Sequence, residues 1–215
     1  MIPTKVADTT REGYVQNIID AYRSATPEQV ARGRRWYATA HELAAMLADG
    51  ETRKGAGVIA ALSANKRWSD NVRLARGAFK IGRPSGHFRD ALRKAERIMR
   101  GDDPEDVLPM GLKTGHFFRC IADPSDPDAV VIDRHAHDIA VGEIYGSRER
   151  GLTTPNRYAL LAHCYREAAQ RLGELPSTVQ AVTWVAHTER VANTATRGPI
   201  ESVEIGGRTY YAPPI

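Results

Sequence analysis

Two side chains near the middle of the chain have the types needed for covalent catalysis at a carbon atom. Lys113 follows Gly111 at the head of an apolar segment of helical character, and Asp133 ends a short run of branched aliphatic residues. The first turn of a helix has free backbone N–H groups that suit a phosphate. In that turn the helix dipole and partial burial would favour a neutral lysine amine, which is a nucleophile. The pair therefore predicts attack on an electrophilic carbon, with Asp133 moving protons or stabilising an oxocarbenium-like cation.

Other interpretations of the same stretch remain open. A lysine in a first helical turn is usually exposed to solvent, and Asp133 beside Arg134 also suits a helix N-cap or a surface ion pair. The His135-Ala-His137 sequence resembles the zinc-binding pair of barrel amidohydrolases. Such a site needs further ligands on later strands, and the chain lacks the eight strand–helix units of a barrel. We expect no metal ion, and we expect these histidines to be hydrogen-bonded structural residues: His116, His135, His137 and His163.

The composition is that of a soluble globular protein that forms one large domain or two small lobes. It has 215 residues, 42% of them hydrophobic and 26% charged, and no apolar run approaches the length of a membrane span. The first residues lack the layout of a signal peptide. We expect a cytoplasmic protein, associated with the nucleoid or, for a viral protein, with the host cytoplasm. Cys120 and Cys164 are expected to be reduced core thiols, because an iron–sulfur cluster needs about four cysteines.

Positive charge is concentrated in one part of the chain. Residues 66–100 contain eleven Lys or Arg against three acids, a surplus of eight, although the formal net charge is +4. Arg outnumbers Lys by 24 to 6 in the whole chain, and Arg binds phosphate bidentately. This pattern is typical of a nucleic-acid surface. A GC-rich genome, or an ordinary solvated helix face, would produce the same composition.

The elements that must position these residues are mostly helices. Apolar periodicity and capping signals predict helices over residues 10–23, 26–47, 53–64, 68–79, 87–101, 112–122, 134–146, 156–173 and 175–192. Thr26 and Gln29 suit a capping box, and residues 129–133 form a short extended run. Helix 87–101 has an apolar stripe made of Phe88, Leu92, Ala95 and Met99. A parallel row of arginines lies one position along, made of Arg89, Arg93, Arg97 and Arg100. With a hairpin around Gly206-Gly207, the predicted fold class is all-α with a small C-terminal β-hairpin.

The stretch "LPMGLKTGHFFRCIA", followed by "AVVIDRHAHDIA", resembles the signature of helix–hairpin–helix DNA glycosylases, the superfamily of endonuclease III and adenine glycosylases. In that family a Leu-Pro-Gly-x-Gly-x-Lys-Thr-Ala hairpin precedes a strand-like Val-Asp-x-His. "ALSANKRWSDNV" is similar to the family's Leu-Ser-Ala-Gln helix end, and "ALRKAERI" to its Lys-Ala-x-x-Ile helix. The likeness covers roughly residues 50–145. The hairpin is one residue shorter here, with Pro109 and Met110 in place of Pro-Gly-x, and the gap from Lys to Asp is longer.

The resemblance implies a two-lobed glycosylase-like fold and a monomer that acts on double-stranded DNA. Residues 50–145 would form a central lobe with the hairpin and the catalytic segment, and residues 1–49 plus 146–215 the second lobe. The enzyme would flip a base from the duplex, and Lys113 would form a Schiff base with the sugar while Asp133 assists. The resemblance implies no cofactor and no iron–sulfur cluster. It leaves open a monovalent cation at the hairpin, which some members of the family bind.

The resemblance also suggests roles for other side chains. DNA contacts are expected from Gly111, Thr114, Asn65, Lys66, Arg67, Arg89 and Arg93, with Asn65 in the gap left by the flipped base. Trp68 or Tyr37 would stack on a base, unless they serve as core residues. His135, Gln180 and Trp184 are further candidates for the pocket. The base itself is not specified, and two rivals keep the same scaffold: a DNA base-modification enzyme and a non-catalytic DNA-binding protein.

Overall fold

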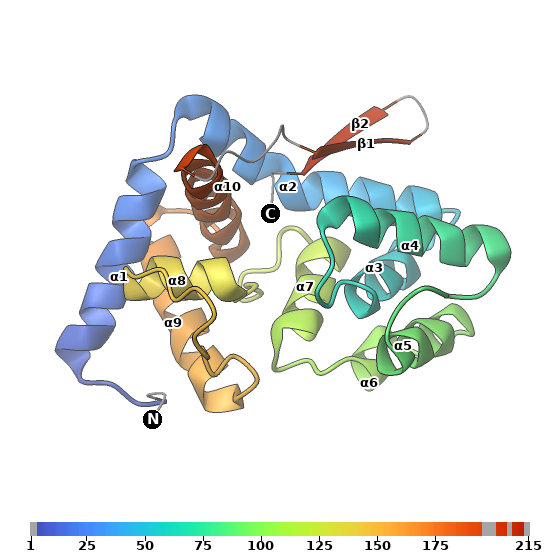
Figure 1. Ribbon diagram of the computed structural model, residues 1–215, viewed down its shortest axis with the longest axis horizontal. Helices are drawn as coiled ribbons and strands as arrows, with labels where there is room; N and C mark the ends of the chain where they lie inside the picture. The colour runs from blue at the N-terminus through green and yellow to red at the C-terminus, as the bar shows by residue number, and fades with distance from the viewer. Residues whose placement is uncertain (1–3, 195–200, 206–207, 213–215) are drawn as a thin grey trace.

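The computed structural model describes residues 4–194, 201–205 and 208–212 and shows a helical protein (Figure 1). The described helices are α1 (Asp8–Arg23), α2 (Pro27–Leu47), α3 (Thr52–Ala61), α4 (Trp68–Ile81), α5 (Arg89–Met99), α6 (Pro104–Val107), α7 (Lys113–Ala122), α8 (Arg134–Val141), α9 (Pro155–Leu172) and α10 (Pro176–Thr194). The predicted all-α class is confirmed. Strands β1 (Glu201–Ile205) and β2 (Arg208–Ala212) pair antiparallel. Gly206 and Gly207, where the sequence predicts the hairpin turn, lie outside the described residues.

Local signals fix several helix ends. Thr26 caps α2 as predicted: its hydroxyl accepts the Gln29 N–H at 3.3 Å, and the Gln29 side chain accepts the Thr26 N–H at 2.8 Å. Helix α8 ends at Val141, earlier than the predicted 146, because Gly142 adopts a left-handed conformation with φ of 76° and closes the helix.

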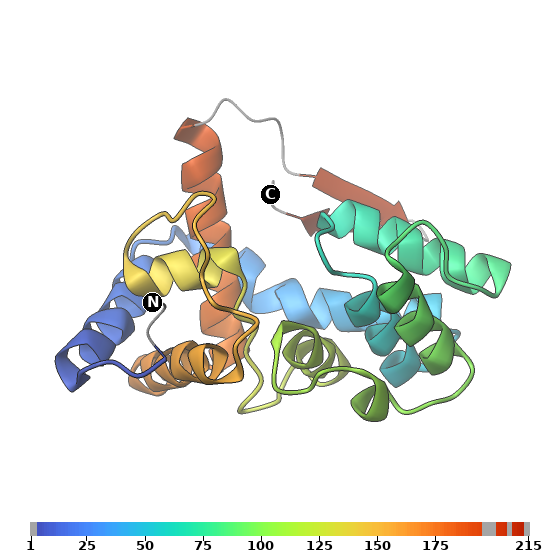
Figure 2. The same ribbon diagram turned by 60° about the horizontal axis from the view of Figure 1, so that its bottom comes forward.

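The buried side chains form two separate hydrophobic cores. The first core is built from α2 to α7, and the second from α1, α8 and α9. Figures 1 and 2 show these two groups of helices side by side, with α2 running along both. Cys120 lies in the first core and Cys164 in the second; both are free and buried, as predicted. Residues 27–47, expected in the second lobe, thus pack in the first core, and residues 134–141, expected in the central lobe, pack in the second.

Helices α2 and α10 join the two halves of the molecule. Helix α2 packs on both α3 and α10. At Gly33 the two backbones of α2 and α10 come so close that a built Cβ atom would lie 2.6 Å from the Val182 Cα atom, so a larger residue there would push the helices apart. Helix α10 places Ala181 in the first core and Val179 in the second. The join is therefore a tightly packed helix pair, and no long linker is needed.

The segment from Ala129 to Asp133 runs between the two cores in an irregular extended conformation, without β-pairing. Its side chains alternate: Ala129 and Val131 enter the first core, and Val130 and Ile132 enter the second. An extended chain turns successive side chains to opposite sides, which explains the alternation. The apolar run is thus buried on both sides, as the sequence suggested, but it belongs to no sheet.

The Tyr158 hydroxyl replaces the missing β-ladder. It accepts the Ile132 N–H at 3.0 Å and donates to the Val130 carbonyl at 3.0 Å. The His116 ring stacks on Tyr158 at 5.2 Å between ring centroids. The His116 Nδ1 atom also accepts the Val130 N–H at 3.4 Å. Since buried backbone groups need partners, Tyr158 and His116 together hold the extended segment and, with it, the position of Asp133.

The hairpin that precedes α7 packs tightly against the start of that helix. A Cβ atom built at Gly115 would lie 2.3 Å from the Met110 Cα atom and 2.7 Å from the Pro109 carbonyl oxygen. Gly115 is therefore required by close backbone contact. By contrast, a Cβ atom at Gly111 would meet nothing within 4 Å. The hairpin backbone at Gly111 is open on its outer side, where a ligand can approach.

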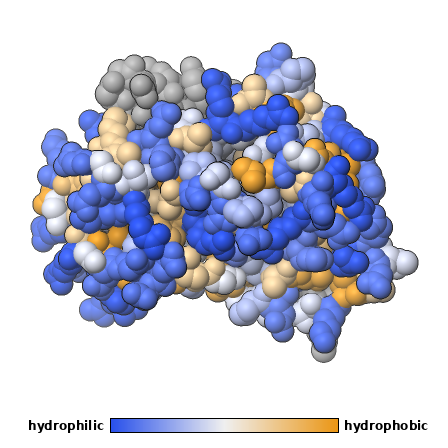
Figure 3. Space-filling model, turned by 180° about the vertical axis from the view of Figure 1, so that it is seen from behind, coloured by the Kyte–Doolittle hydropathy of each residue, from blue (hydrophilic) through white to orange (hydrophobic). Residues whose placement is uncertain are grey.

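The surface is largely polar. The face in Figure 3 is dominated by hydrophilic residues, with hydrophobic residues in small separate patches. None of the described helices has the length and apolar character needed to cross a membrane. The sequence predicted Phe88 within the apolar stripe of helix 87–101, but Phe88 is 58% exposed. Helix α5 begins at Arg89, with Phe88 as its N-cap, and its buried residues are Ala91, Ala95 and Ile98.

Substituting Tyr158→Phe should lower the free energy of unfolding by about 1–3 kcal/mol, because the buried Ile132 N–H and Val130 carbonyl lose their partner. Chemical denaturation of both proteins measures the difference. Tyr14→Phe is the matched control in the same core, since the Tyr14 hydroxyl has no hydrogen bond to the described residues; it should change stability by less than about 0.5 kcal/mol. Equal stability of Tyr158→Phe and the unmodified protein would show that the Tyr158 hydroxyl does not stabilise the extended segment.

Candidate active site

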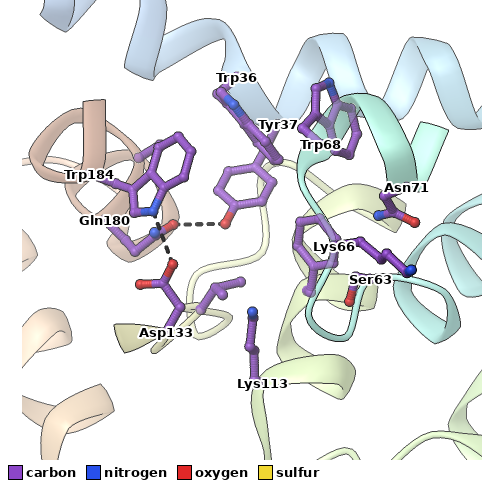
Figure 4. A pocket seen from close by; sticks show the side chains of 13 residues that line it. Trp36, Tyr37, Ser63, Lys66, Trp68, Asn71, Lys113, Asp133, Gln180 and Trp184 are labelled. Atoms are coloured by element: carbon purple, nitrogen blue, oxygen red, sulfur yellow. Dashed lines mark hydrogen bonds between the residues drawn. The ribbon is translucent and has the colours of Figure 1, made fainter. Parts of the chain in front are cut away.

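Lys113 and Asp133, the two residues singled out for chemistry, line the same cavity. Lys113 is the first residue of α7, and Asp133 is the N-cap of α8. Figure 4 shows the Lys113 amine pointing into the cavity, with the Asp133 carboxylate at the neighbouring wall. The cavity has a volume of about 100 Å³ and is lined mainly by residues of the first core, with Asp133 supplied by the start of α8. The two side chains are thus brought together by helix ends from different halves of the molecule.

The Asp133 carboxylate is held by two hydrogen bonds. One oxygen accepts the Ala136 N–H at 2.8 Å, which is the N-cap bond of α8, and the other accepts the indole N–H of Trp184 at 3.0 Å. The N-cap role considered from the sequence is therefore real, and it does not remove Asp133 from the cavity. These bonds fix the orientation of the carboxylate.

Lys113 is held much less tightly. Its side chain is exposed, so the partial burial expected from the sequence is not found, and among the described residues it forms no hydrogen bond or ion pair. Leu112, at the N-cap of α7, supplies no side-chain cap. The first N–H groups of α7 therefore face the same region as the amine, where the dipole disfavours positive charge and suits an anion.

Aromatic rings form one wall of the cavity. Trp36 lies at the centre of this wall. Its ring centroid is 4.8 Å from Tyr37, 5.0 Å from Trp68, 6.0 Å from Phe117 and 6.5 Å from Trp184. The rings come from α2, α4, α7 and α10, so the wall exists only when these helices pack together. Such a surface suits the flat face of another aromatic ring.

Tyr37 of this wall forms a hydrogen bond with Gln180, another residue that lines the cavity. The Tyr37 hydroxyl donates to the Gln180 side-chain oxygen at 2.8 Å. Burial raises the pKa of Tyr37 well above its ordinary value, so the hydroxyl keeps its proton. Gln180 consequently has its oxygen engaged and retains its NH₂ group as a donor.

A larger groove opens beside the cavity and shares Lys113, Asp133, Lys66 and Trp184 with it. Its volume is about 740 Å³. Among the described residues that line the groove, four are cationic and one is a carboxylate: Lys66, Arg67, Lys113 and Arg134 against Asp133. The predicted DNA-binding residues Asn65 and Thr114 lie here, as does His135. The groove therefore has the positive charge that a phosphate backbone needs.

Three residues predicted to bind DNA do not line the cavity or the groove: Gly111, Arg89 and Arg93. Much of the Arg row on α5 is neutralised by ion pairs. Arg93 contacts Asp90 at 2.7 Å, Arg97 contacts Asp102 at 2.6 Å and Arg100 contacts Glu96 at 2.6 Å. The basic surplus counted along the sequence thus overstates the free positive charge of this helix.

Several cavity residues escaped the sequence analysis, namely Trp36, Ser63, Asn71 and Phe117 in the cavity and Arg134 as a groove cation. Asn71 follows Trp68 by three positions, so the helical period would have placed both on one face of α4. For Trp36 and Phe117 no signal in the sequence distinguishes a cavity wall from an ordinary core. Trp68, Gln180 and Trp184, proposed as pocket residues, do line the cavity.

The histidines of α8 point to different surroundings. The His137 ring is buried and contacts Asp138 at 2.8 Å and Arg157 at 3.2 Å. His135 lies 5.5 Å from the His187 ring and 6.2 Å from Trp184. Both residues are on a helix, so the barrel amidohydrolase alternative is wrong. Within the described part of the chain, no group of three or more His, Cys, Asp or Glu side chains is arranged to hold a metal ion.

The hairpin before α7 offers backbone carbonyls, which are the ligands an alkali cation takes. The Pro109 carbonyl, however, already accepts the Leu112 N–H at 3.0 Å and lies against Gly115. A cation would have to share this engaged oxygen, so the hairpin is a poor fit for one. We derive no step of the chemistry through such an ion.

The fold and the site define an all-α protein with an aromatic-walled cavity that opens onto a cationic groove. Residues 1–191 match the model of a family of unknown function (DUF7178), and because this match spans most of the 215 residues, the chain belongs to that family. No curated protein and no solved structure matched the chain.

Acid should destabilise the protein between pH 6.5 and 4 through His187, next to the groove residue His135. Burial lowers the pKa of His187 to about 4, so below pH 6.5 the unfolded chain binds a proton that the folded protein does not. Stability is full above pH 6.5 and falls by up to about 3 kcal/mol as the pH drops to 4.

Denaturant titrations at several pH values would measure this loss. His187→Phe should reduce the acid loss but leave the part that comes from His116, whose pKa burial also lowers to about 4. His163→Phe, at a histidine that is 60% exposed, should leave the dependence unchanged. A His187→Phe protein with the same acid sensitivity as the unmodified chain would show that another group is responsible.

Proposed function

We propose that the protein is a DNA glycosylase with AP-lyase activity on a two-lobed, helix–hairpin–helix glycosylase-like scaffold that includes the C-terminal hairpin. The observation that carries the proposal is the meeting of Lys113 and Asp133 in one aromatic-walled cavity at the edge of a cationic groove. A nucleophile, a carboxylate, a stacking surface and a phosphate track are the parts that base removal needs.

Binding would begin with the DNA backbone in the groove. Arg67, Arg134 and Lys66 supply positive charge, and the uncapped N-terminus of α7 supplies backbone N–H groups for a phosphate. One nucleotide then leaves the base stack and enters the cavity, where its base lies against the rings around Trp36. Asn65, in the loop before α4 with φ of 55°, is at the groove and suited to fill the vacated space in the duplex.

The chemical step uses the two residues of the cavity. Once the Lys113 amine has lost a proton, its lone pair forms a bond to the anomeric carbon of the sugar. The glycosidic C–N bond breaks, and its electron pair leaves with the base, which takes up a proton. The attacking nitrogen loses a proton to Asp133 or water. Its lone pair then breaks the C1′–O4′ bond, the ring oxygen takes up a proton, and the opened sugar is a protonated imine. Asp133 also stabilises the cationic character of the sugar while the bond breaks.

Strand cleavage follows from the imine. The protonated imine acidifies the adjacent C2′–H bond, so loss of that proton expels the 3′ phosphate by β-elimination. Water then hydrolyses the imine and returns Lys113 as the free amine. Every group in this sequence belongs to the chain, the DNA or water. We accordingly propose a monomer without a resident cofactor that acts on double-stranded DNA in the cytoplasm.

Lys113→Gln should abolish borohydride trapping on a duplex with one abasic site, lowering adduct formation at least about 100-fold. The unmodified protein should give a covalent protein–DNA adduct, seen as a shifted band on a denaturing gel. Asp133→Asn should slow release of an intact base because the developing cation loses its counter-charge. Lys94→Gln is the matched control, since Lys94 pairs with Asp90 on α5; it should trap normally.

The alternatives give different results in the same assay. Binding without an adduct and without free base would show a non-catalytic DNA-binding protein. Release of base without an adduct would show a monofunctional glycosylase. A change to the base that leaves the glycosidic bond intact would show a base-modification enzyme. Each of these would contradict the lyase proposal.

Neutralising the groove should weaken DNA binding in a salt-dependent way. The double variant Arg67→Ala, Arg134→Ala should reduce the slope of log affinity against log salt by about 2, since each phosphate contact contributes about 0.9. Fluorescence anisotropy of a labelled duplex at several salt concentrations measures this slope. The control Arg93→Ala, Arg97→Ala removes the same charge from ion-paired positions on α5 and should change the slope by less than about 0.5. Equal slopes for the two double variants would count against this DNA path.

A further inference from the structure

Asn71 occupies an unusual position in the cavity wall. It is 2% exposed, it lines the cavity beside Ser63 and Trp68, and among the described residues its side-chain oxygen has no hydrogen-bond partner (Figure 4). A buried acceptor without a partner costs free energy, and native proteins carry few of them. Leucine has nearly the same shape and would avoid this cost. A requirement of folding therefore does not explain why this position is an asparagine.

A second amide at the cavity is Gln180, on α10. Its oxygen is engaged by the Tyr37 hydroxyl at 2.8 Å, which leaves its NH₂ group as a donor. Asn71 contributes an unengaged acceptor, and a rotation of its amide would present a donor instead. The cavity thus offers both kinds of hydrogen-bonding group, beside an aromatic wall. A flat heterocycle with N–H and carbonyl groups on its edge would satisfy them.

Charge around the cavity argues against a cationic ligand. Aromatic faces attract cations, but the charged side chains that line this cavity in the described structure are Lys66, Lys113 and Asp133. Both oxygens of Asp133 already accept hydrogen bonds, from Ala136 and Trp184. A base with a positive charge would meet two lysines and one engaged carboxylate. A neutral base with carbonyl groups avoids this repulsion.

We infer that Asn71 is the specificity-determining residue of the cavity and that the cavity takes an uncharged, carbonyl-bearing base. This inference rests on the proposed function and assigns it a substrate class. Asn71 hydrogen-bonds the edge of the extruded base, and it takes no part in the reaction at the sugar. An abasic site carries no base, so its cleavage is independent of Asn71. That difference separates recognition from chemistry.

The experiment compares Asn71→Leu with the unmodified protein on five duplexes. Three carry one uncharged base each (uracil, hypoxanthine or 8-oxoguanine), one carries the cationic base 7-methylguanine, and one carries an abasic site. The unmodified protein should release at least one uncharged base faster than 7-methylguanine. Asn71→Leu should slow that release 10- to 100-fold, because a buried group of the base loses its partner. Its borohydride trapping on the abasic duplex should stay within twofold of the unmodified protein.

The melting temperature separates recognition from a structural role, because loss of a structural asparagine would lower it. Asn71→Leu should melt at the same temperature as the unmodified protein or higher, because the unpaired acceptor is gone. Asn17→Leu is the matched control: the Asn17 amide donates to the Ala140 carbonyl at 3.0 Å, away from the cavity. This control should melt at a lower temperature and release base at the normal rate while folded. Asn71→Asp should also slow release of the uncharged base, because its carboxylate lacks the donor.

Three outcomes would overturn the inference. They are unchanged base release by Asn71→Leu, faster release of 7-methylguanine than of any uncharged base, and normal trapping on abasic DNA with no uncharged base released. A protein that neither traps on abasic DNA nor releases any base would overturn the proposed function itself, and the assignment of Asn71 with it.

Discussion

The structure depends on the clamp that Tyr158 places on the extended segment from Ala129 to Ile132. This segment has apolar side chains on both sides and no β-partner, so its Ile132 N–H and Val130 carbonyl would be left unpaired without the hydroxyl. Because alternate residues enter different cores, the segment cannot shift by one residue without exchanging the two sets of side chains. The position of this segment consequently sets where Asp133 lies and where α8 begins.

The cavity is a product of the same junction. One wall comes from helices of the first core, and the Asp133 side comes from the start of α8, which packs in the second. Helix α10 connects them, because Trp184 bonds Asp133 while Gln180 bonds Tyr37. These two bonds fix the polar groups that must be oriented before a ligand arrives. Lys113 and Asn71 are left without such bonds among the described residues, which suits groups that act on a ligand.

Electrostatics divides the surface in a way that net charge does not reveal. On α5 and at its C-cap the arginines Arg93, Arg97 and Arg100 pair with neighbouring acids and belong to an ordinary solvated surface. The described residues that line the groove include four cations and one carboxylate, which is already hydrogen-bonded, so the lining carries a net positive charge. Long-range attraction of a polyanion depends on such unbalanced charge, because paired charges largely cancel beyond a few ångströms. The proposed DNA path therefore follows the groove beside the cavity and avoids the Arg row.

The sequence by itself determined the helical class, the capping box of α2 and the two residues placed at helix starts, Lys113 and Asp133. These follow from local periodicity and from chemistry at helix ends, which act within a few residues of the chain. Tertiary structure alone decided that α2 packs in the first core and that Trp36, Asn71 and Phe117 meet at one cavity. Those facts depend on contacts between helices far apart in the chain. Local patterns identify which face of a helix is apolar, but not which partner, cavity or counter-charge that face will meet.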